Sequence, residues 1–180
     1  MLPFNFKTDH QMMDEALRDL VTLLQKEDLE WSFELLDLFW RQLAVHIRAE
    51  NVCLFPTILN APRDVFGKNG LPEFEDVKTI VDQLRADHNF LVDHLAQALR
   101  ILRQLLACTN TLPDDVTNSI GDIRAHIVAV SERLRSHAKL EQERVYRWPE
   151  LILSREQLET LQDAFLRESE TVPRNVARLA

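Results

Sequence analysis

Glycine is nearly absent from this chain, which contains 3 glycines among 180 residues. Tight hairpin turns and phosphate-binding loops depend on glycine, because other residues rarely adopt a positive φ. The shortage therefore disfavours β-sandwiches, β-barrels and Gly-rich nucleotide sites. Since 46% of the residues are hydrophobic and 28% are charged, the chain has the composition of a folded globular domain. The sequence predicts an all-α protein.

The charge balance excludes several kinds of partner. The chain has 21 basic and 29 acidic residues, a net charge of −8, and no Lys/Arg cluster forms the basic face that nucleic acid or an anionic membrane requires. No stretch of about 18 apolar residues is present, and the first ten residues lack the pattern of a signal peptide. We therefore expect no nucleic-acid partner, no membrane association and a cytoplasmic location.

The two cysteines agree with that location. Cys53 and Cys108 both lie in apolar segments. Two buried thiols in a reducing compartment are the favoured interpretation, and a single disulfide is the alternative.

Apolar residues recur at the spacing of an α-helix in five segments. The first four span about residues 8–26, 30–59, 75–108 and 114–147, and the fifth begins after residue 154. Pro56 is expected to kink or end the second helix, because proline has no N–H to donate and its ring obstructs the preceding turn. Trp148-Pro149 is expected to end the fourth helix in the same way.

Two helix starts carry a capping box, in which a Ser or Thr and a Gln three residues later exchange hydrogen bonds with the backbone. Thr8 and Gln11 form the first pair, and Ser154 and Gln157 form the second. The second pair predicts where the fifth helix begins.

One long break, residues 60–74, separates the helices into two pairs and contains Gly67 and Gly70. Short connections on either side of it predict two antiparallel hairpins. We therefore expect residues 1–150 to form an up-down-up-down four-helix bundle. Residues 151–180 are expected to supply an additional C-terminal helix and tail. The apolar face of that helix is expected to pack on the bundle or to serve as a homodimer surface, and it comprises Leu158, Leu161 and Phe165.

Four of the six histidines fall on the apolar stripes, one on each of the first four helices. They are His10, His46, His88 and His137. Those of the second and fourth helices are followed four residues later by Glu50 and Glu141, a spacing that puts imidazole and carboxylate on one helix face. An aromatic residue lies nine positions after each of these two histidines, Phe55 and Tyr146. The repeated pattern indicates an internal duplication.

The four histidines are expected at matching levels of the bundle. His10 and His46 each lie 18 residues from the predicted turn of their hairpin, and His88 and His137 lie 24 and 25 residues from theirs. At about 1.5 Å per residue, the members of each pair meet across their hairpin. If the hairpins align, four imidazoles and two carboxylates converge inside the bundle.

A metal is the natural partner for these six groups, because burying them without one is expensive. Imidazole and carboxylate ligands without a thiolate favour iron, with manganese or zinc as alternatives. Six ligands are too many for one tetrahedral zinc ion. Two metal ions that share Glu50 and Glu141 as bridges fit the set better.

These motifs resemble the hemerythrin-like (HHE cation-binding) family over about residues 7–149. The resemblance rests on Asp9-His10, His46-x-x-x-Glu50 followed by Leu54-Phe55-Pro56, Asp87-His88, and His137-x-x-x-Glu141 followed by Tyr146. It implies a non-haem di-iron centre, oxo- or hydroxo-bridged, with both glutamates as bridges and the four histidines as terminal ligands. It also implies a small diatomic partner, dioxygen or nitric oxide, that is bound or sensed, or a role in handling iron.

The chain departs from hemerythrins proper at two points. Val92 stands where they have a fifth histidine, one turn after the histidine of the third helix, and the spacing from His to acid in the last helix is shorter by one. Asp14, one turn after His10, is therefore an alternative ligand, although an acid in a first turn more often serves the helix dipole. We expect His126 to be a core histidine or to lie behind the ligands, and His94 to be solvated.

Two other functions remain open. One is a di-iron redox enzyme that reduces peroxide or nitric oxide or repairs iron centres. The other is a structural helical module that keeps the fold without the metal.

Overall fold

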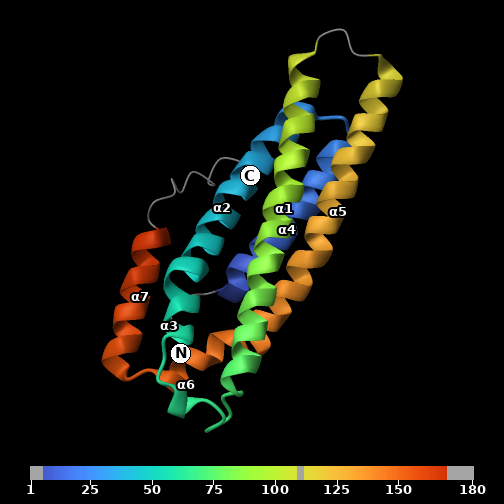
Figure 1. Ribbon diagram of the computed structural model, residues 1–180. Coiled ribbons are helices and arrows are strands. Elements are labelled where there is room, and N and C mark those ends of the chain that lie inside the picture. The colour runs from blue at the N-terminus through green and yellow to red at the C-terminus, as the bar shows by residue number, and fades with distance from the viewer. Residues whose placement is uncertain (1–5, 109–111, 170–180) are drawn as a thin grey trace.

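The computed structural model describes residues 6–108 and 112–169, and every regular element within these ranges is a helix (Figure 1). The helix α1 packs against α2 and α5, and α4 packs against the same two helices, so each long helix has two long neighbours. The long helices are α1 (Phe6–Gln25), α2 (Leu29–Ala49), α4 (Phe74–Ala107) and α5 (Pro113–Glu143). The predicted all-helical bundle is confirmed. The Asp9 side chain and residues 170–180 lie outside the described part of the chain.

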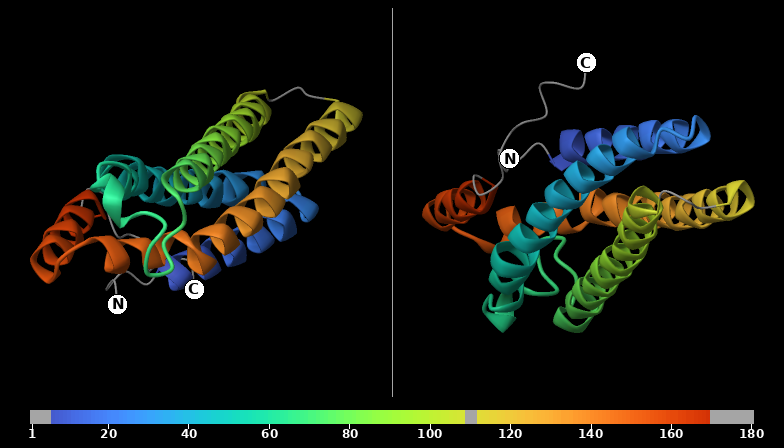
Figure 2. Two further views of the ribbon diagram at one scale, coloured as in Figure 1. Left: turned by 60° about the horizontal axis from the view of Figure 1, so that its bottom comes forward. Right: turned by 90° about the horizontal axis from the view of Figure 1, so that it is seen from above.

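Shorter helices connect or cover the long ones. Their bounds are α3 (Phe55–Leu59), α6 (Trp148–Ile152) and α7 (Arg155–Ser169), with a π-helix at Glu50–Leu54 and 3₁₀ turns at Arg63–Val65 and Val145–Arg147. The helix α7 packs along α2 and the π-helix on the outside of the bundle (Figure 2). It is the additional helix that the sequence predicted.

The apolar face of α7 is covered by its own chain. Leu161 and Phe165 are 5% and 2% exposed and join a cluster with Phe55 and Ile58, while Leu158 is half-buried. Of the two roles expected for this face, packing on the bundle is the one that the structure shows. A role for α7 in a homodimer stays a prediction.

The capping box of α7 forms as expected. The backbone N–H of Gln157 donates to Ser154 Oγ over 3.3 Å, and the backbone N–H of Ser154 donates to Gln157 Oε1 over 2.9 Å. We predict that Ser154→Ala lowers the free energy of unfolding by about 1 kcal/mol and frays the start of α7, measured by denaturation and by limited proteolysis. Ser136→Ala is the matched control, because Ser136 is exposed within α5 and donates only to the carbonyl of Glu132. Equal stability of the two variants would contradict the prediction.

Two predicted helix boundaries are wrong. The helix α1 begins at Phe6, so Thr8 lies inside it and is not its N-cap. The helix α5 ends at Glu143 rather than at Arg147. Arg144 leaves the helical conformation with φ −127° and ψ −65°, and the 3₁₀ turn that follows directs Val145 into the core, where it is fully buried.

A π-helix at Glu50–Leu54 is the feature of the second helix that the sequence did not predict. The N–H of Phe55 donates to the carbonyl of Glu50, five residues back, whereas an α-helix uses the carbonyl four residues back. Pro56 explains the wider turn, because it donates no hydrogen bond and its ring needs room near the carbonyl of Val52. The predicted kink at Pro56 is therefore spread over the turn before it. Glu50 is the first residue of that turn.

The long connector between the two helical pairs lies where its glycines predicted it. Gly67 has φ +71° and its N–H donates to the carbonyl of Pro72 over 3.1 Å. A Cβ at Gly67 would collide with the carboxylate of Glu73. Gly70, with φ +85°, completes a turn that only glycine adopts readily.

The interior contains two separate apolar clusters. The first core fills the half of the bundle nearer the two hairpin turns and includes Leu17, Leu24, Phe39, Leu95 and Ile127. The second core fills the other end, where α3, α6 and α7 gather, and includes Leu54, Phe55, Ile58, Val81 and Trp148. On α2 the first core ends at Leu43 and the second begins at Ala49. A layer of polar residues lies between them.

The prediction that both cysteines are buried is wrong for Cys108. Cys53 is half-buried and Cys108 is exposed, because Cys108 directly follows the last residue of α4. The two do not form a disulfide. Burial raises the pKa of the Cys53 thiol, so this group remains protonated near neutral pH.

No helix within the described ranges combines the length and the apolar character needed to cross a membrane.

Candidate metal centre

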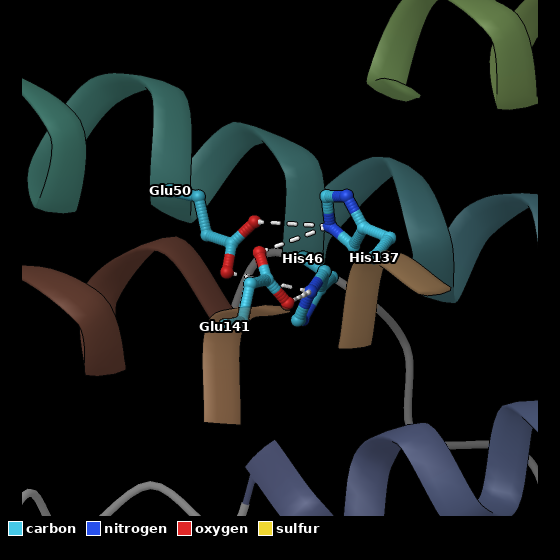
Figure 3. A group of neighbouring side chains, drawn as sticks. All are labelled: His46, Glu50, His137 and Glu141. Carbon is cyan, nitrogen blue, oxygen red and sulfur yellow. Dashed lines mark ion pairs between the residues drawn. The ribbon is translucent and has the colours of Figure 1, made fainter. Parts of the chain in front are cut away.

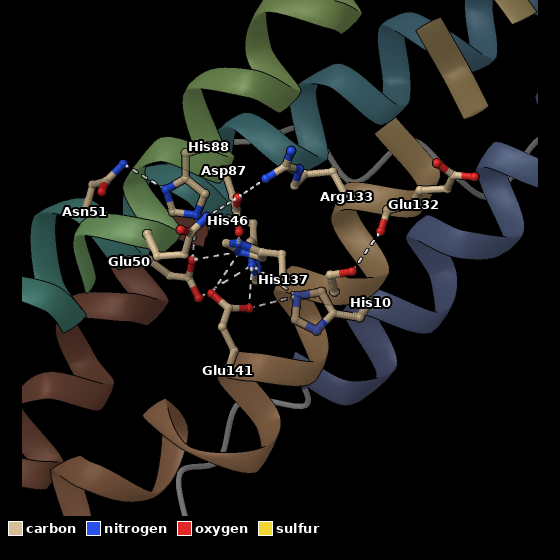
Figure 4. A network of polar contacts seen from close by, with 12 residues as sticks. His10, His46, Glu50, Asn51, Asp87, His88, Glu132, Arg133, His137 and Glu141 are labelled. Atoms are coloured by element: carbon tan, nitrogen blue, oxygen red, sulfur yellow. Dashed lines mark hydrogen bonds and ion pairs between the residues drawn. The ribbon is translucent and has the colours of Figure 1, made fainter. Parts of the chain in front are cut away.

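Six polar side chains form the layer between the two cores. All are buried, with exposed fractions between 0% and 7%. They come from all four long helices and the π-helix, and they are His10 (α1), His46 (α2), Glu50 (π-helix), His88 (α4), and His137 and Glu141 (α5). These are the six residues singled out in the sequence, and their side chains point toward one another (Figure 4).

The histidines meet in two pairs, as the equal distances from the hairpin turns predicted. His10 and His46 face each other with Nε2 atoms 3.3 Å apart. The ring centroids of His88 and His137 are 4.8 Å apart. We refer to these as the His10 end and the His88 end of the centre.

Each carboxylate extends from one end to the other. Glu50 places Oε1 3.5 Å from His46 Nε2 and Oε2 3.1 Å from His88 Nε2. Glu141 places Oε2 3.3 Å from His10 Nε2 and Oε1 2.9 Å from His137 Nε2. Each end therefore gathers two imidazole nitrogens and one oxygen from each glutamate.

Four residues of this layer form the tightest group. One ligand atom from each of His46, Glu50, His137 and Glu141 lies within 4.8 Å of every other, and Figure 3 shows them as two His/Glu pairs facing each other. Both pairs have the His-x-x-x-Glu spacing, so the duplicated motif is what brings the group together. The arrangement is a buried cluster able to bind metal.

Unsatisfied atoms indicate where a cation fits. Four buried atoms at the His88 end lie within 3.1 Å of one another in two pairs but form no hydrogen bond of good geometry: Glu50 Oε2 with His88 Nε2, and Glu141 Oε1 with His137 Nε2. Buried polar atoms are rarely left in this state. Two carboxylate oxygens and two imidazole nitrogens facing one point fit a metal ion, which accepts all four lone pairs at once.

The pKa values of two histidines are shifted in opposite directions, and the shift of His137 shows the same demand for positive charge. Burial lowers the pKa of His46 to about 4. Burial also disfavours the charged form of His137, but the charge of Glu141 and contact with Asp87 raise its pKa from 6.5 to about 10. Without a metal, His137 thus retains a proton between the two buried carboxylates. A bound cation would supply that charge instead.

In three of the histidines, Nδ1, the ring nitrogen on the side away from the centre, lies near a polar side chain. His10 Nδ1 lies 3.2 Å from the Gln142 amide, and His88 Nδ1 lies 3.2 Å from the Asn51 amide. The Asn51 carbonyl oxygen has no partner. Turning this amide over would let that oxygen accept from Nδ1–H, which leaves Nε2 of His88 free to face the centre.

The sequence contained a signal for these neighbours that its interpretation missed. Asn51 directly follows Glu50, and Gln142 directly follows Glu141. The duplicated motif therefore extends by one amide residue in each copy, and each amide contacts a histidine of another helix.

Asp87 is the polar neighbour of the third such nitrogen, Nδ1 of His137. Its Oδ1 accepts from Arg133 and from Gln83, each over 2.9 Å, and its Oδ2 lies 3.6 Å from His137 Nδ1. Burial works to raise the pKa of Asp87, but the nearby His137 imidazole and the hydrogen bonds from Arg133 and Gln83 lower it overall. The ionised carboxylate fixes the orientation of His137.

We predict that Asp87→Asn weakens metal binding by about 10- to 100-fold, the usual effect of losing a group that orients a metal-binding histidine. A competition titration against a chelator measures the affinity. Asp82→Asn on the same helix is the control, since the Asp82 side chain is 56% exposed. An affinity unchanged in Asp87→Asn would show that Asp87 does not position His137.

Tyr146 contributes a hydroxyl to the centre. It lies 2.7 Å from Glu50 Oε1 and 2.8 Å from Glu141 Oε2, the two oxygens of the His10 end, and they share its single hydrogen. Burial and the two carboxylates raise the pKa of Tyr146 well above its usual value. The sequence marked Tyr146 only as part of the repeat, and this contact was not foreseen.

An open groove of about 570 Å³ reaches the His10 end between α1 and α5. His10 and Gln142 lie in it, and its rim contains Asp14, Arg135 and Lys139. Of the six residues of the centre, His10 is the one that lines the groove.

Other residues considered in the sequence lie elsewhere. Asp14 is ion-paired with Arg18 and Arg135, each over 3.1 Å, so the structure shows it at the groove rim and not among the ligand atoms. Val92 is 36% exposed. His94, expected to be solvated, and His126, expected in the core or behind the ligands, are both half-buried and contact each other.

A family-model comparison matches the hemerythrin HHE cation-binding domain over residues 3–149. The chain belongs to this family. The match covers all six residues of this HHE centre and ends within α6, so α7 lies outside it. Comparisons with curated proteins and with solved structures found no significant match.

Proposed function

We propose that this HHE protein holds a non-haem di-iron centre and uses it to bind or sense a small diatomic ligand, dioxygen or nitric oxide, or to handle iron. Each end of the centre would hold one ion, through His10 and His46 at one end and His88 and His137 at the other. Glu50 and Glu141 support the two-ion arrangement, because each directs one oxygen to each end. This division of the carboxylate oxygens is the observation that carries the proposal.

Iron is the metal proposed because the donors are neutral imidazoles and carboxylates, with manganese or zinc as the alternatives. Bound iron would supply an exchangeable coordination position for a diatomic ligand. The groove at His10 supports access from solvent, and its position favours the His10 end as the place where such a ligand enters. Gln142, which lies in the groove and contacts His10, would control the width of this entrance.

Metal analysis combined with the optical spectrum of the oxidised protein tests the proposal. We expect about two irons per chain and strong near-ultraviolet absorption, which changes when nitric oxide or azide is added. A zinc-loaded protein would show no such absorption. If protein purified from cells grown in iron-replete medium contained no iron and no other d-block metal, the metal-free helical module would be supported instead.

A redox enzyme is the second candidate, and Tyr146 is the observation that favours it. Its hydroxyl places a proton donor between the two carboxylates, whereas the sequence had indicated no dedicated acid. Reducing hydrogen peroxide to two waters requires two protons and two electrons, so such a donor would be useful. We predict that Tyr146→Phe slows peroxide turnover with an added reductant by about 100-fold while metal content stays at the wild-type level. Wild-type turnover no faster than that of free iron would argue against an enzyme.

We also propose the up-down-up-down order of the four long helices and a cytoplasmic location. The contacts of α1 with α2 and α5, and of α4 with the same helices, support that order. The half-buried Cys53 and the exposed Cys108, which do not form a disulfide, support a reducing compartment. A homodimer remains a prediction, to be tested by sedimentation.

A further inference from the structure

The two histidines outside the centre contact each other. The chain has six histidines, and the two that remain, His94 on α4 and His126 on α5, have Nδ1 atoms 3.1 Å apart. Their ring centroids are 5.0 Å apart with planes at 73°. Both side chains are half-buried, so solvent reaches the pair.

The separation of the two nitrogens matches that of ligands on one metal ion. With metal–nitrogen bonds of about 2.0–2.1 Å, two adjacent ligands lie about 2.9 Å apart in a square-planar complex and about 3.3 Å apart in a tetrahedral one. The observed 3.1 Å falls between these values. Both Nδ1 atoms would therefore reach one ion without movement of α4 or α5.

We propose that His94 and His126 form a second metal site, which binds one divalent ion such as Cu²⁺ or Zn²⁺ through both Nδ1 atoms, with water completing the coordination. In the absence of an ion, one Nδ1–H donates to the other Nδ1. On binding, that hydrogen moves to Nε2, and the solvent exposure of the rings lets water accept it.

The surroundings hold the pair in place. His94 stacks on Phe90 at 4.1 Å between ring centroids, and the guanidinium of Arg133 lies 4.5 Å above the same ring. The positive charge of Arg133 is offset by Asp87, 2.9 Å away, and Asp93 adds a negative charge beside His94. Burial and the neighbouring His126 lower the pKa of His94. The imidazole is therefore neutral near pH 7, and protons do not compete for its lone pair.

The donors of this pair differ from those of the HHE centre. Two imidazoles without a contacting carboxylate favour copper, nickel or zinc, whereas the mixed carboxylate and imidazole set of the centre suits iron or manganese. The pair would therefore select a different metal. The inference does not depend on which metal the centre holds.

Copper titration of the full-length protein as purified tests the proposal, followed by equilibrium binding and by electron paramagnetic resonance. We expect wild-type protein to bind one more Cu²⁺ per chain than His126→Asn, with hyperfine splitting from two nitrogens. His94→Asn should weaken this binding by about 100-fold, since the second nitrogen no longer acts on the same ion. Because the result is a difference between variants, it is independent of the occupancy of the centre.

Asp93→Asn is the matched control, because it removes the neighbouring charge and leaves both imidazoles in place. It should retain the additional ion and the two-nitrogen spectrum. Equal copper binding by wild type, His94→Asn and His126→Asn would overturn the proposal, as would a wild-type spectrum without splitting from two nitrogens. His94 and His126 lie on different helices, so loss of the additional ion in one folded variant decides the question if the other variant folds poorly.

Discussion

Replacing Glu141 with alanine is expected to reduce the metal content of the purified protein from about two ions per chain to about a tenth of that value or less. The reason is that Glu141 serves both ends of the centre, with one oxygen 2.9 Å from His137 Nε2 and the other 3.3 Å from His10 Nε2. Its removal takes an oxygen donor from each end at once. Elemental analysis after gel filtration measures the result.

Glu143→Ala is the matched control for that variant. Glu143 lies two residues further along α5, and its side chain is 61% exposed. It should keep the wild-type metal content, and circular dichroism should show that both variants remain helical. If Glu141→Ala bound as much metal as Glu143→Ala, the centre would not lie between the two glutamates.

Removing the metal from the wild-type protein is expected to lower Tm by about 5–11 °C. A ligand present at 100 times its Kd contributes about 2.7 kcal/mol to the folded state, and 1 kcal/mol shifts Tm by about 2–4 °C in a chain of this size. The physical source is the set of buried atoms that form no hydrogen bond of good geometry without a cation, among them Glu50 Oε2 and His88 Nε2. Differential scanning calorimetry with and without a chelator measures the shift.

Glu141→Ala also serves as the control for this second experiment. The variant has little metal to lose, so chelation should leave its Tm unchanged. A wild-type Tm that does not respond to the chelator, in protein shown to have lost its metal, would mean that the ion contributes nothing to folding stability.

Most of the fold and the site follow from helical periodicity and from the positions of the histidines. Counting residues from each hairpin turn placed His10 opposite His46, and the structure shows their Nε2 atoms 3.3 Å apart. The i, i+4 spacing placed Glu50 beside His46 and Glu141 beside His137. These predictions succeed because they depend only on the rise and the repeat of an α-helix.

The predictions that failed depend on local geometry or on exposure. Pro56 predicted a kink or an end of the second helix. The π-helix before it depends on how the backbone hydrogen bonds rearrange, and the spacing of apolar residues does not describe that. The end of α5 at Glu143 depends on the burial of Val145 in the second core. Cys108 was expected to be buried, but it directly follows the last residue of α4, at Ala107, where the chain leaves the interior.

Contacts between helices were also missed, because one sequence does not show which side chains cross from one helix to another. Tyr146 reaches Glu50 across 96 positions of the chain, and Asn51 reaches His88. The repeat contained both residues, but their partners depend on how the two copies are packed.

The placement of the polar layer between two apolar cores bears on how the protein unfolds. Along α2 and α4, the buried residues of the first core and those of the second core lie on opposite sides of the polar layer. A bound ion would tie those helices together at the boundary and couple the cores into one cooperative unit. Without it, the end formed by α3, α6 and α7 gains a route to open by itself, as a partial unfolding unit. Occupancy of the centre would then determine whether the protein unfolds in one transition or in two.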